Sequence, residues 1–308
     1  MQTEFEYVNK RGEKLFARKV IPNEKPVIAL MLWFHGMHGH TGAVPDQLFI
    51  NTMAKIGIAC VCYDQIGHGK SVSDDLRGHL VNWEYLIDDG VHFIKQYFAG
   101  KLKDVPPMDV PFFIAGASMG GCVTLLTSLR VQDAIINGDM KDAGNWLGSA
   151  MFAPALFNDI QPPWVVLQGL KLVASMGGGK LKWGPEPDPE KFESPEIYKL
   201  FLADPLTYSD AMHLSMGKNL LDMTDYAKTM LDQIHFPFLV VHHENDPVIP
   251  ARGSRQIYDS AQSTEKDVKV ISTEQCVATH LIHSKEPAME MTIEWVNNRL
   301  QAHQDSDK

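Results

Sequence analysis

The stretch Pro111-Phe112-Phe113-Ile114-Ala115-Gly116-Ala117-Ser118-Met119-Gly120-Gly121 decides the fold. Its apolar run is short and begins after a proline, a pattern that is typical of a buried strand. The residues that follow, 122–130, place Val123, Leu126 and Leu129 at helical spacing. We therefore expect a strand, a sharp turn and then a helix that packs on a sheet.

The turn between this strand and helix has the composition of a nucleophile site. Gly116 and Gly120 flank Ser118 without side chains, so strand and helix can approach closely while the serine occupies a strained turn. The backbone N–H of Met119 would then lie at a helix N-terminus, where it can stabilise an oxyanion. The alternative is an ordinary glycine-rich loop, and the strand-then-helix context favours the nucleophile.

Length and composition bound the class of protein. A chain of 308 residues with 44% hydrophobic residues can form one large α/β domain or a core with an insertion. The net charge of −10 argues against a nucleic-acid partner. Residues 1–12 carry both charge signs and lack the apolar run of a signal peptide. We therefore expect a cytoplasmic protein, which could still touch membranes.

Strand-like and helix-like patterns alternate along most of the chain. A hairpin is predicted at 3–20, where polar and apolar residues alternate around Asn9-Lys10-Arg11-Gly12. Strands are then expected at 27–34, 58–63, 112–115, 148–153, 238–243 and 268–272, and helices at 45–56, 82–99, 122–130, 252–263 and 286–301. This order implies an α/β fold with a mostly parallel central sheet and helices on both faces.

The alternation breaks at residues 155–226, which are rich in proline and glycine and show no strand pattern. We interpret them as an inserted, largely helical cap, with 1–154 and 227–308 forming the core. An apolar segment inside the insertion includes Trp164 and Leu170. It could be the core of the cap, which we favour; it could also line an acyl pocket or rest on a membrane surface.

A loop rich in histidine and glycine, His35-Gly36-Met37-His38-Gly39-His40, follows a predicted central strand. Three histidines suggest a metal, but no carboxylate or cysteine completes a ligand set, so we expect none. The N–H of Met37 could instead supply a second oxyanion donor. His35 would hold the loop by hydrogen bonding, and we place His35 and Gly36 beside the substrate.

A second glycine-rich loop, Asp64-Gln65-Ile66-Gly67-His68-Gly69-Lys70-Ser71, invites comparison with a phosphate-binding loop. The phosphate motif requires a glycine five residues before Gly69, and that position is Asp64. We therefore do not expect a phosphate site there.

Serine needs a base, and the base needs an orienting acid. Ser118, Asp246 and His280 each follow a predicted strand and occur in the chain order associated with a nucleophile elbow. Asp64 and Glu244 compete with Asp246 for the acid, and His283 competes with His280 for the base. We prefer Asp246, which sits in a turn sequence, and His280, which comes first after the strand.

Several segments resemble the α/β-hydrolase superfamily, and within it the monoacylglycerol lipase and lysophospholipase branch. They are His35-Gly36, Asp64-x-x-Gly67-His68-Gly69-x-Ser71, Gly116-x-Ser118-Met119-Gly120-Gly121, Ala153-Pro154, Asp204-Pro205-Leu206-Thr207-Tyr208, Asn245-Asp246-Pro247-Val248 and His280-x-x-His283. The cap from 155 to 200 and the loop His38-Gly39-His40-Thr41 depart from that pattern.

The resemblance implies roles for particular residues. Ser118 would be the nucleophile, Asp246 the orienting acid and His280 the base, with the N–H groups of Met37 and Met119 as oxyanion donors. It also implies a helical cap and esters with an apolar acyl chain as substrates.

The sequence thus predicts a serine carboxyl-ester hydrolase that acts on a small lipid ester, such as a monoacylglycerol or lysophospholipid, without a metal or organic cofactor. An acyltransferase or thioesterase with the same triad is the first alternative. A ligand-binding receptor on the same fold is the alternative from another class.

Overall fold

A computed structural model describes residues 1–72, 76–102, 109–140, 145–157, 164–184, 195–246, 248–272 and 283–306. Its centre is an eight-stranded sheet with the strand order β1-β2-β4-β3-β5-β6-β9-β10. The strands are β1 Gln2–Val8, β2 Lys14–Val20, β3 Ala29–Phe34, β4 Ile58–Tyr63, β5 Phe112–Ala117, β6 Trp146–Phe152, β9 Phe238–His243 and β10 Lys266–Ile271.

Strand direction follows the sequence prediction. β1 and β2 form the predicted antiparallel hairpin, and β2 also runs antiparallel to β4. All the remaining neighbours in the sheet are parallel. Every residue of β3, β4, β5 and β9 is buried, which is why these strands are apolar on both faces.

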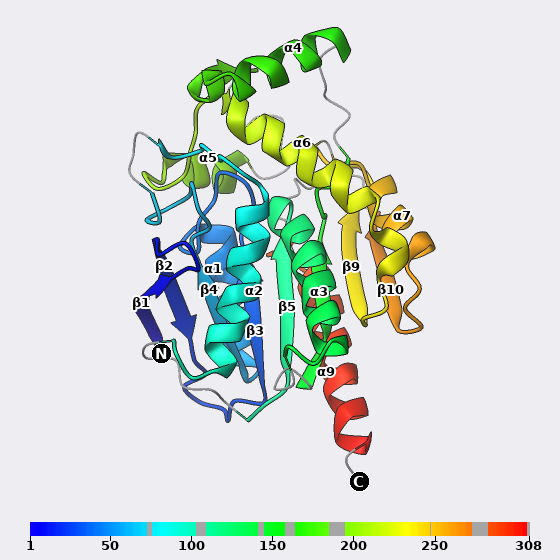
Figure 1. Cartoon of the computed structure of the whole chain (residues 1–308). Helices are drawn as coiled ribbons and strands as arrows, with labels where there is room; N and C mark the ends of the chain where they lie inside the picture. Colours follow the sequence, from blue (N-terminus) through cyan, green and yellow to red (C-terminus); the bar gives the residue numbers. More distant parts are fainter. Residues whose placement is uncertain are drawn as a thin grey trace.

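Helices cover both faces of the sheet and form two separate cores (Figure 1). In β4, Ala59 and Val61 point into the core with helices α2 and α3, whereas Cys60 and Cys62 point into the core with α1 and α9. The helices of the two layers, and α7 beside β10, are α1 Val44–Lys55, α2 Glu84–Phe98, α3 Met119–Ile136, α7 Arg252–Ser260 and α9 Ala288–Ser306. The fold is therefore the predicted α/β-hydrolase arrangement.

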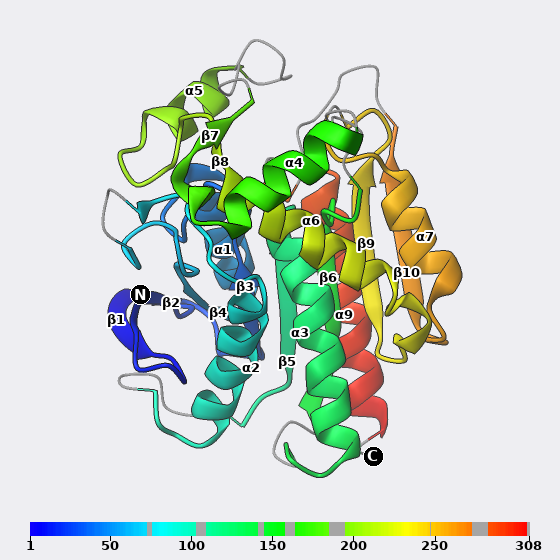
Figure 2. The ribbon, with the colours of Figure 1, turned by 45° about the horizontal axis from the view of Figure 1, so that its top comes forward.

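The residues between β6 and β9 are mainly helical. They form α4 Trp164–Ser175, the short helix η3 Gly178–Lys180, β7 Lys182–Trp183, α5 Pro195–Ala203, β8 Met212–His213 and α6 Leu214–Lys228. α4 and α5 lie beyond the carboxyl ends of the strands (Figure 2). The sequence predicted no strand here, yet β7 and β8 pair over two residues each, a length too short to give a periodic signal.

Helix α6 connects this region to the rest of the protein. Its later residues Met223 and Ala227 join the core shared by α2 and α3. The predicted boundary at residue 226 thus falls inside α6, and the division into core and cap stays a prediction. In the described part of the chain, no helix is both long and apolar enough to cross a lipid bilayer.

Strand β5 and helix α3 meet at a very close contact. A Cβ atom added to Gly120 would lie 2.2 Å from the carbonyl oxygen of Phe34 and 2.5 Å from that of His35. One added to Gly116 would lie 2.4 Å from the carbonyl oxygen of Gly120. Any side chain at these positions would push the first turn of α3 away from the ends of β3 and β5.

Replacing Gly120 by alanine should therefore destabilise the fold, by about 2 kcal/mol or more, because backbone atoms must move. Urea unfolding of Gly120→Ala and wild type measures the difference. Gly169→Ala is the matched control, since nothing lies within 4 Å of a Cβ there. Equal stability of Gly120→Ala and Gly169→Ala would contradict the close contact.

Candidate active site

Ser118 occupies a single-residue turn between β5 and α3. Its backbone has φ 56° and ψ −119°, a combination that L-residues rarely adopt. From 112 to 129 every residue is buried except Ser118, which is partly exposed. The strand and helix are thus inside the protein, and the fold presents this one side chain at their junction.

Hydrogen bonds from neighbouring segments hold the turn in its strained conformation. The N–H of Ser118 donates to the carbonyl oxygen of Phe152 at 2.9 Å, and the carbonyl oxygen of Ser118 accepts from the N–H of Ala155 at 2.9 Å and of Gly121 at 3.0 Å. Strain of this kind persists only where the surroundings determine it, and it is common at catalytic residues.

Two backbone N–H groups are available near Ser118. Met119 is the first residue of α3, so its N–H has no acceptor within the helix. Gly36 packs on the serine, because a Cβ added there would lie 3.4 Å from Ser118 Cβ. Met37 follows directly, and neither its N–H nor that of Met119 has an acceptor among the residues described.

His35 is fully buried and makes hydrogen-bonding contacts within the loop and with the end of β4. Its Nε2 accepts a hydrogen bond from the N–H of Gln65 at 3.0 Å, and Nδ1 lies 2.8 Å from the carbonyl oxygen of Gly36. Burial lowers the pKa of the His35 imidazole to about 3, so the ring is neutral. These contacts agree with the loop-holding role proposed for His35; its placement beside the substrate stays a prediction.

The other histidines of this loop have separate contacts. His40 Nε2 lies 3.1 Å from Asp204 Oδ2, and the ring of His38 packs on Tyr208 with the ring centres 5.0 Å apart. Across the described ranges, no group of three or more His, Cys, Asp or Glu residues is placed to hold a metal ion.

Asp246 follows β9 and has a fully buried side chain. Its Oδ1 accepts hydrogen bonds from the N–H groups of Val248 and Ile249, both at 2.8 Å. Its Oδ2 is buried and has no hydrogen-bond donor in the described part of the chain. Burial raises the pKa of this carboxyl to about 7, against the lowering effect of the two N–H groups. One oxygen is therefore fixed, and the other can accept a hydrogen bond.

The two competing carboxylates are otherwise engaged. Asp64 Oδ1 accepts from the N–H and the hydroxyl of Thr41 at 2.8 and 2.7 Å, and its Oδ2 accepts from the N–H of Lys70 at 2.8 Å. Glu244 is exposed and pairs with Arg255. Of the three candidates, Asp246 alone combines burial with an oxygen that lacks a donor in the described ranges.

His280 lies outside the described residues, which resume at His283. His283 is buried against aromatic rings, with ring centres 4.9 Å from Trp33 and 5.9 Å from Phe49. His283 was the competing candidate for the base, and its burial in this aromatic cluster argues against a role at the serine.

The apolar helix α4 differs from the favoured prediction of a cap core. Val165 and Leu172 in this helix expose 73% and 61% of their surface, and Met176, which follows its last residue, exposes 78%. Leu170 is partly exposed, and the side chain of Trp164 lies outside the described set. These residues therefore present an apolar surface rather than filling a core.

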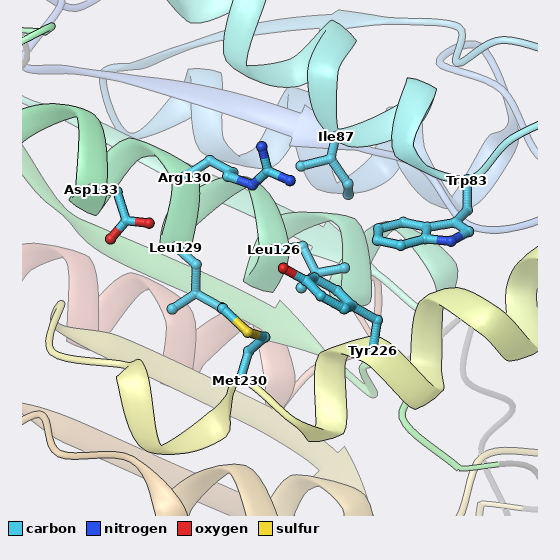
Figure 3. A pocket seen from close by; sticks show the side chains of 8 residues that line it. All are labelled: Trp83, Ile87, Leu126, Leu129, Arg130, Asp133, Tyr226 and Met230. Atoms are coloured by element: carbon cyan, nitrogen blue, oxygen red, sulfur yellow. The ribbon is translucent and has the colours of Figure 1, made fainter.

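A separate hollow lies between α2, α3 and α6 (Figure 3). The rings of Trp83 and Tyr226 contact each other in its wall, with ring centres 5.1 Å apart, and Arg130 is another lining residue. None of the nucleophile, acid or oxyanion candidates lines this hollow, so we give it no role in the site.

Replacing Asp246 by asparagine should change how the stability of the fold depends on pH. The Asp246 carboxyl has a pKa of about 7 in the folded protein and an ordinary value of 3.8, so the folded state binds this proton more tightly than the unfolded state. Wild type should therefore lose stability as the pH rises from about 4 to about 7. Asparagine cannot ionise, so the stability of the variant relative to wild type should rise as the pH increases from 5 to 8. Thermal unfolding of both proteins at these two pH values tests this, and a stability difference that is the same at pH 5 and pH 8 would contradict it.

Comparison with known proteins places this geometry in a family. Residues 25–284 match the family described as "Serine aminopeptidase, S33". An uncharacterized abhydrolase domain-containing protein of Dictyostelium discoideum is 26% identical over 94% of this chain, which spans 28% of that protein's length. A caffeoylshikimate esterase of Arabidopsis thaliana is 24% identical (86% of this chain, 75% of the relative), and human monoglyceride lipase is 22% identical (95% and 89%).

Solved structures show the same fold. A monoacylglycerol lipase of Paleococcus ferrophilus has a TM-score of 0.71 at 20% identity, over 94% of this chain and 99% of that one. A soluble variant of monoglyceride lipase from Saccharomyces cerevisiae has a TM-score of 0.74 at 17% identity, over 97% and 94%. The chain therefore belongs to the serine aminopeptidase S33 family of α/β-hydrolases.

Proposed function

We propose that the protein is a serine carboxyl-ester hydrolase with Ser118 as nucleophile, His280 as base and Asp246 as orienting acid. The observation that carries the proposal is the turn at Ser118, where a positive φ and two sterically required glycines present one partly exposed hydroxyl. The similarity to lipases and esterases supports the same reaction class.

The mechanism follows from these positions. His280 accepts the hydroxyl proton of Ser118 as the oxygen attacks the ester carbonyl. The N–H groups of Met37 and Met119 donate to the oxyanion that forms. Asp246 Oδ2 accepts a hydrogen bond from the imidazolium and stabilises its charge. His280 then protonates the leaving alcohol, and water cleaves the acyl-enzyme by the reverse proton transfers. No metal or organic cofactor enters these steps.

The substrate we propose is a lipid ester with an apolar acyl chain, such as a monoacylglycerol or a lysophospholipid. Val165 and Leu172 support this choice, because α4 exposes these apolar side chains beyond the carboxyl ends of the strands, where Ser118 also lies. A surface of this kind can rest on aggregated lipid. We therefore also propose peripheral contact between α4 and the lipid surface.

Replacing Ser118 by alanine should lower kcat by roughly four to six orders of magnitude, because the triad acts as a unit. The assay uses p-nitrophenyl esters from acetate to palmitate, a monoacylglycerol and a lysophospholipid, with a thioester and a peptide nitroanilide alongside. Circular dichroism confirms that the variant is folded. Turnover of Ser118→Ala near the wild-type rate would contradict the proposal. Turnover by wild type of the thioester alone or the peptide alone would show a thioesterase or a peptidase instead of an ester hydrolase.

Replacing Val165 by glutamate should slow hydrolysis of a monoacylglycerol in vesicles at least severalfold while leaving p-nitrophenyl acetate unaffected. The charge opposes contact between α4 and lipid but lies away from the reacting atoms. Ile136→Glu is the matched control, since Ile136 is 71% exposed at the far end of α3 and Val165 is 73% exposed. Equal losses on both substrates, or equal losses in both variants, would refute a lipid-facing α4.

A further inference from the structure

The loop of residues 35–42, which contains the proposed oxyanion donor Met37, is contacted by a segment distant in sequence. We call residues 198–208, the end of α5 and the turn after it, the α5 segment. The N–H of Tyr208 donates to the carbonyl oxygen of His38 at 3.1 Å. Asp204 Oδ2 lies 3.1 Å from Nε2 of the buried His40. Asp204 and Tyr208 of the α5 segment therefore contact two residues of the loop, His40 and His38.

The contact from Tyr208 acts on a strained residue. His38 has φ 66°, in the left-handed region that non-glycine residues seldom occupy. The carbonyl group that Tyr208 binds lies two peptide units after the peptide that carries the Met37 N–H, so fixing it restrains the direction of that N–H. Such a conformation needs neighbours that determine it, and Tyr208 supplies both a hydrogen bond and a ring contact.

Packing supports the same arrangement independently of the hydrogen bonds. A Cβ added to Gly39 would lie 3.5 Å from the ring of Phe201, so this ring rests on the backbone of the loop. Phe201, Tyr198 and Ala43 form a small apolar cluster separate from the two main cores. This cluster packs the α5 segment against Ala43, the residue that follows the loop.

The core holds the opposite side of the loop. His35 is bound to Gln65, and Thr41 is bound to Asp64. The loop thus lies between the ends of β3 and β4 on one side and the α5 segment on the other. Contacts from the core fix its two ends, and contacts from the α5 segment fix its middle.

We propose that Asp204 and Tyr208 are positioning residues for oxyanion stabilisation: they hold His38 and His40 so that the N–H of Met37 points at the reacting oxygen. This inference rests on the function proposed above. It assigns the Asp204-Pro205-Leu206-Thr207-Tyr208 segment a part in the chemical step, beyond covering the site.

Asp204→Asn is the most selective variant. Asp204 Oδ1 accepts from the N–H of Leu206 at 2.9 Å, and asparagine can keep that bond while losing the charge that faces His40. Asp210→Asn is the matched control, because it makes the same change in the same region at an exposed carboxylate that pairs with Lys182. His40→Gln removes the contact from the loop side and serves if Asp204→Asn fails to fold.

The experiment measures kcat and KM for a medium-chain p-nitrophenyl ester, and the rate at which a fluorophosphonate labels Ser118. Complete loss of an oxyanion donor lowers kcat about a hundredfold or more. A misaligned donor should cause part of that loss, a decrease in kcat of about tenfold with KM unchanged. The labelling rate should fall by a similar factor. His40→Gln should match Asp204→Asn, and the double variant should be no worse than either single one, since both remove one contact. Asp210→Asn should behave as wild type.

A wild-type labelling rate and kcat in Asp204→Asn and in His40→Gln would overturn the inference. A raised KM with unchanged kcat would also overturn it, since that result indicates substrate binding. If wild type is labelled at Ser118 but hydrolyses no ester, the proposed reaction fails, and the labelling rates still test the positioning role. If wild type is not labelled, Ser118 is not activated and both proposals fail.

Discussion

The structure depends on the close approach of the first turn of α3 to the ends of β3 and β5. Gly120 lies so near the carbonyl oxygens of Phe34 and His35 that only a hydrogen atom fits between them. This contact places Ser118 in its strained turn, sets the N–H of Met119 at the helix start and brings Gly36 against the serine. One steric constraint thus determines the relative positions of the nucleophile and of both proposed oxyanion donors.

The remaining parts of the site are attached to this centre by hydrogen bonds between loops at the carboxyl edge of the sheet. Gln65 and Asp64, at the end of β4, hold the loop after β3. Asp246, after β9, is fixed through N–H groups of its own turn. Because neighbouring parallel strands end at the same edge, residues far apart in sequence come together without long connections. The α5 segment, which lies between β6 and β9 in the chain, then contacts the loop of residues 35–42.

Much of this arrangement could be predicted from sequence, because local patterns determine it. Runs apolar on both faces marked the central strands, and the glycines around Ser118 marked the turn. Other features have no local signal. β7 and β8 are too short for a period, and the exposed side chains of α4 look the same in sequence as the face of a core helix. The pairing of His40 with Asp204 depends on tertiary contacts alone.

The buried ionisable groups around the site have a consequence for acid tolerance. Burial lowers the pKa of His35 and His68 to about 3, so each favours the folded state less as pH falls below the ordinary histidine value. Burial raises the pKa of Asp46 and Asp246 to about 7, so each favours the folded state more over the same range. Proton uptake by unfolded histidines therefore opposes proton uptake by folded carboxyls, and the protein's tolerance of mild acid depends on the balance between these two kinds of group.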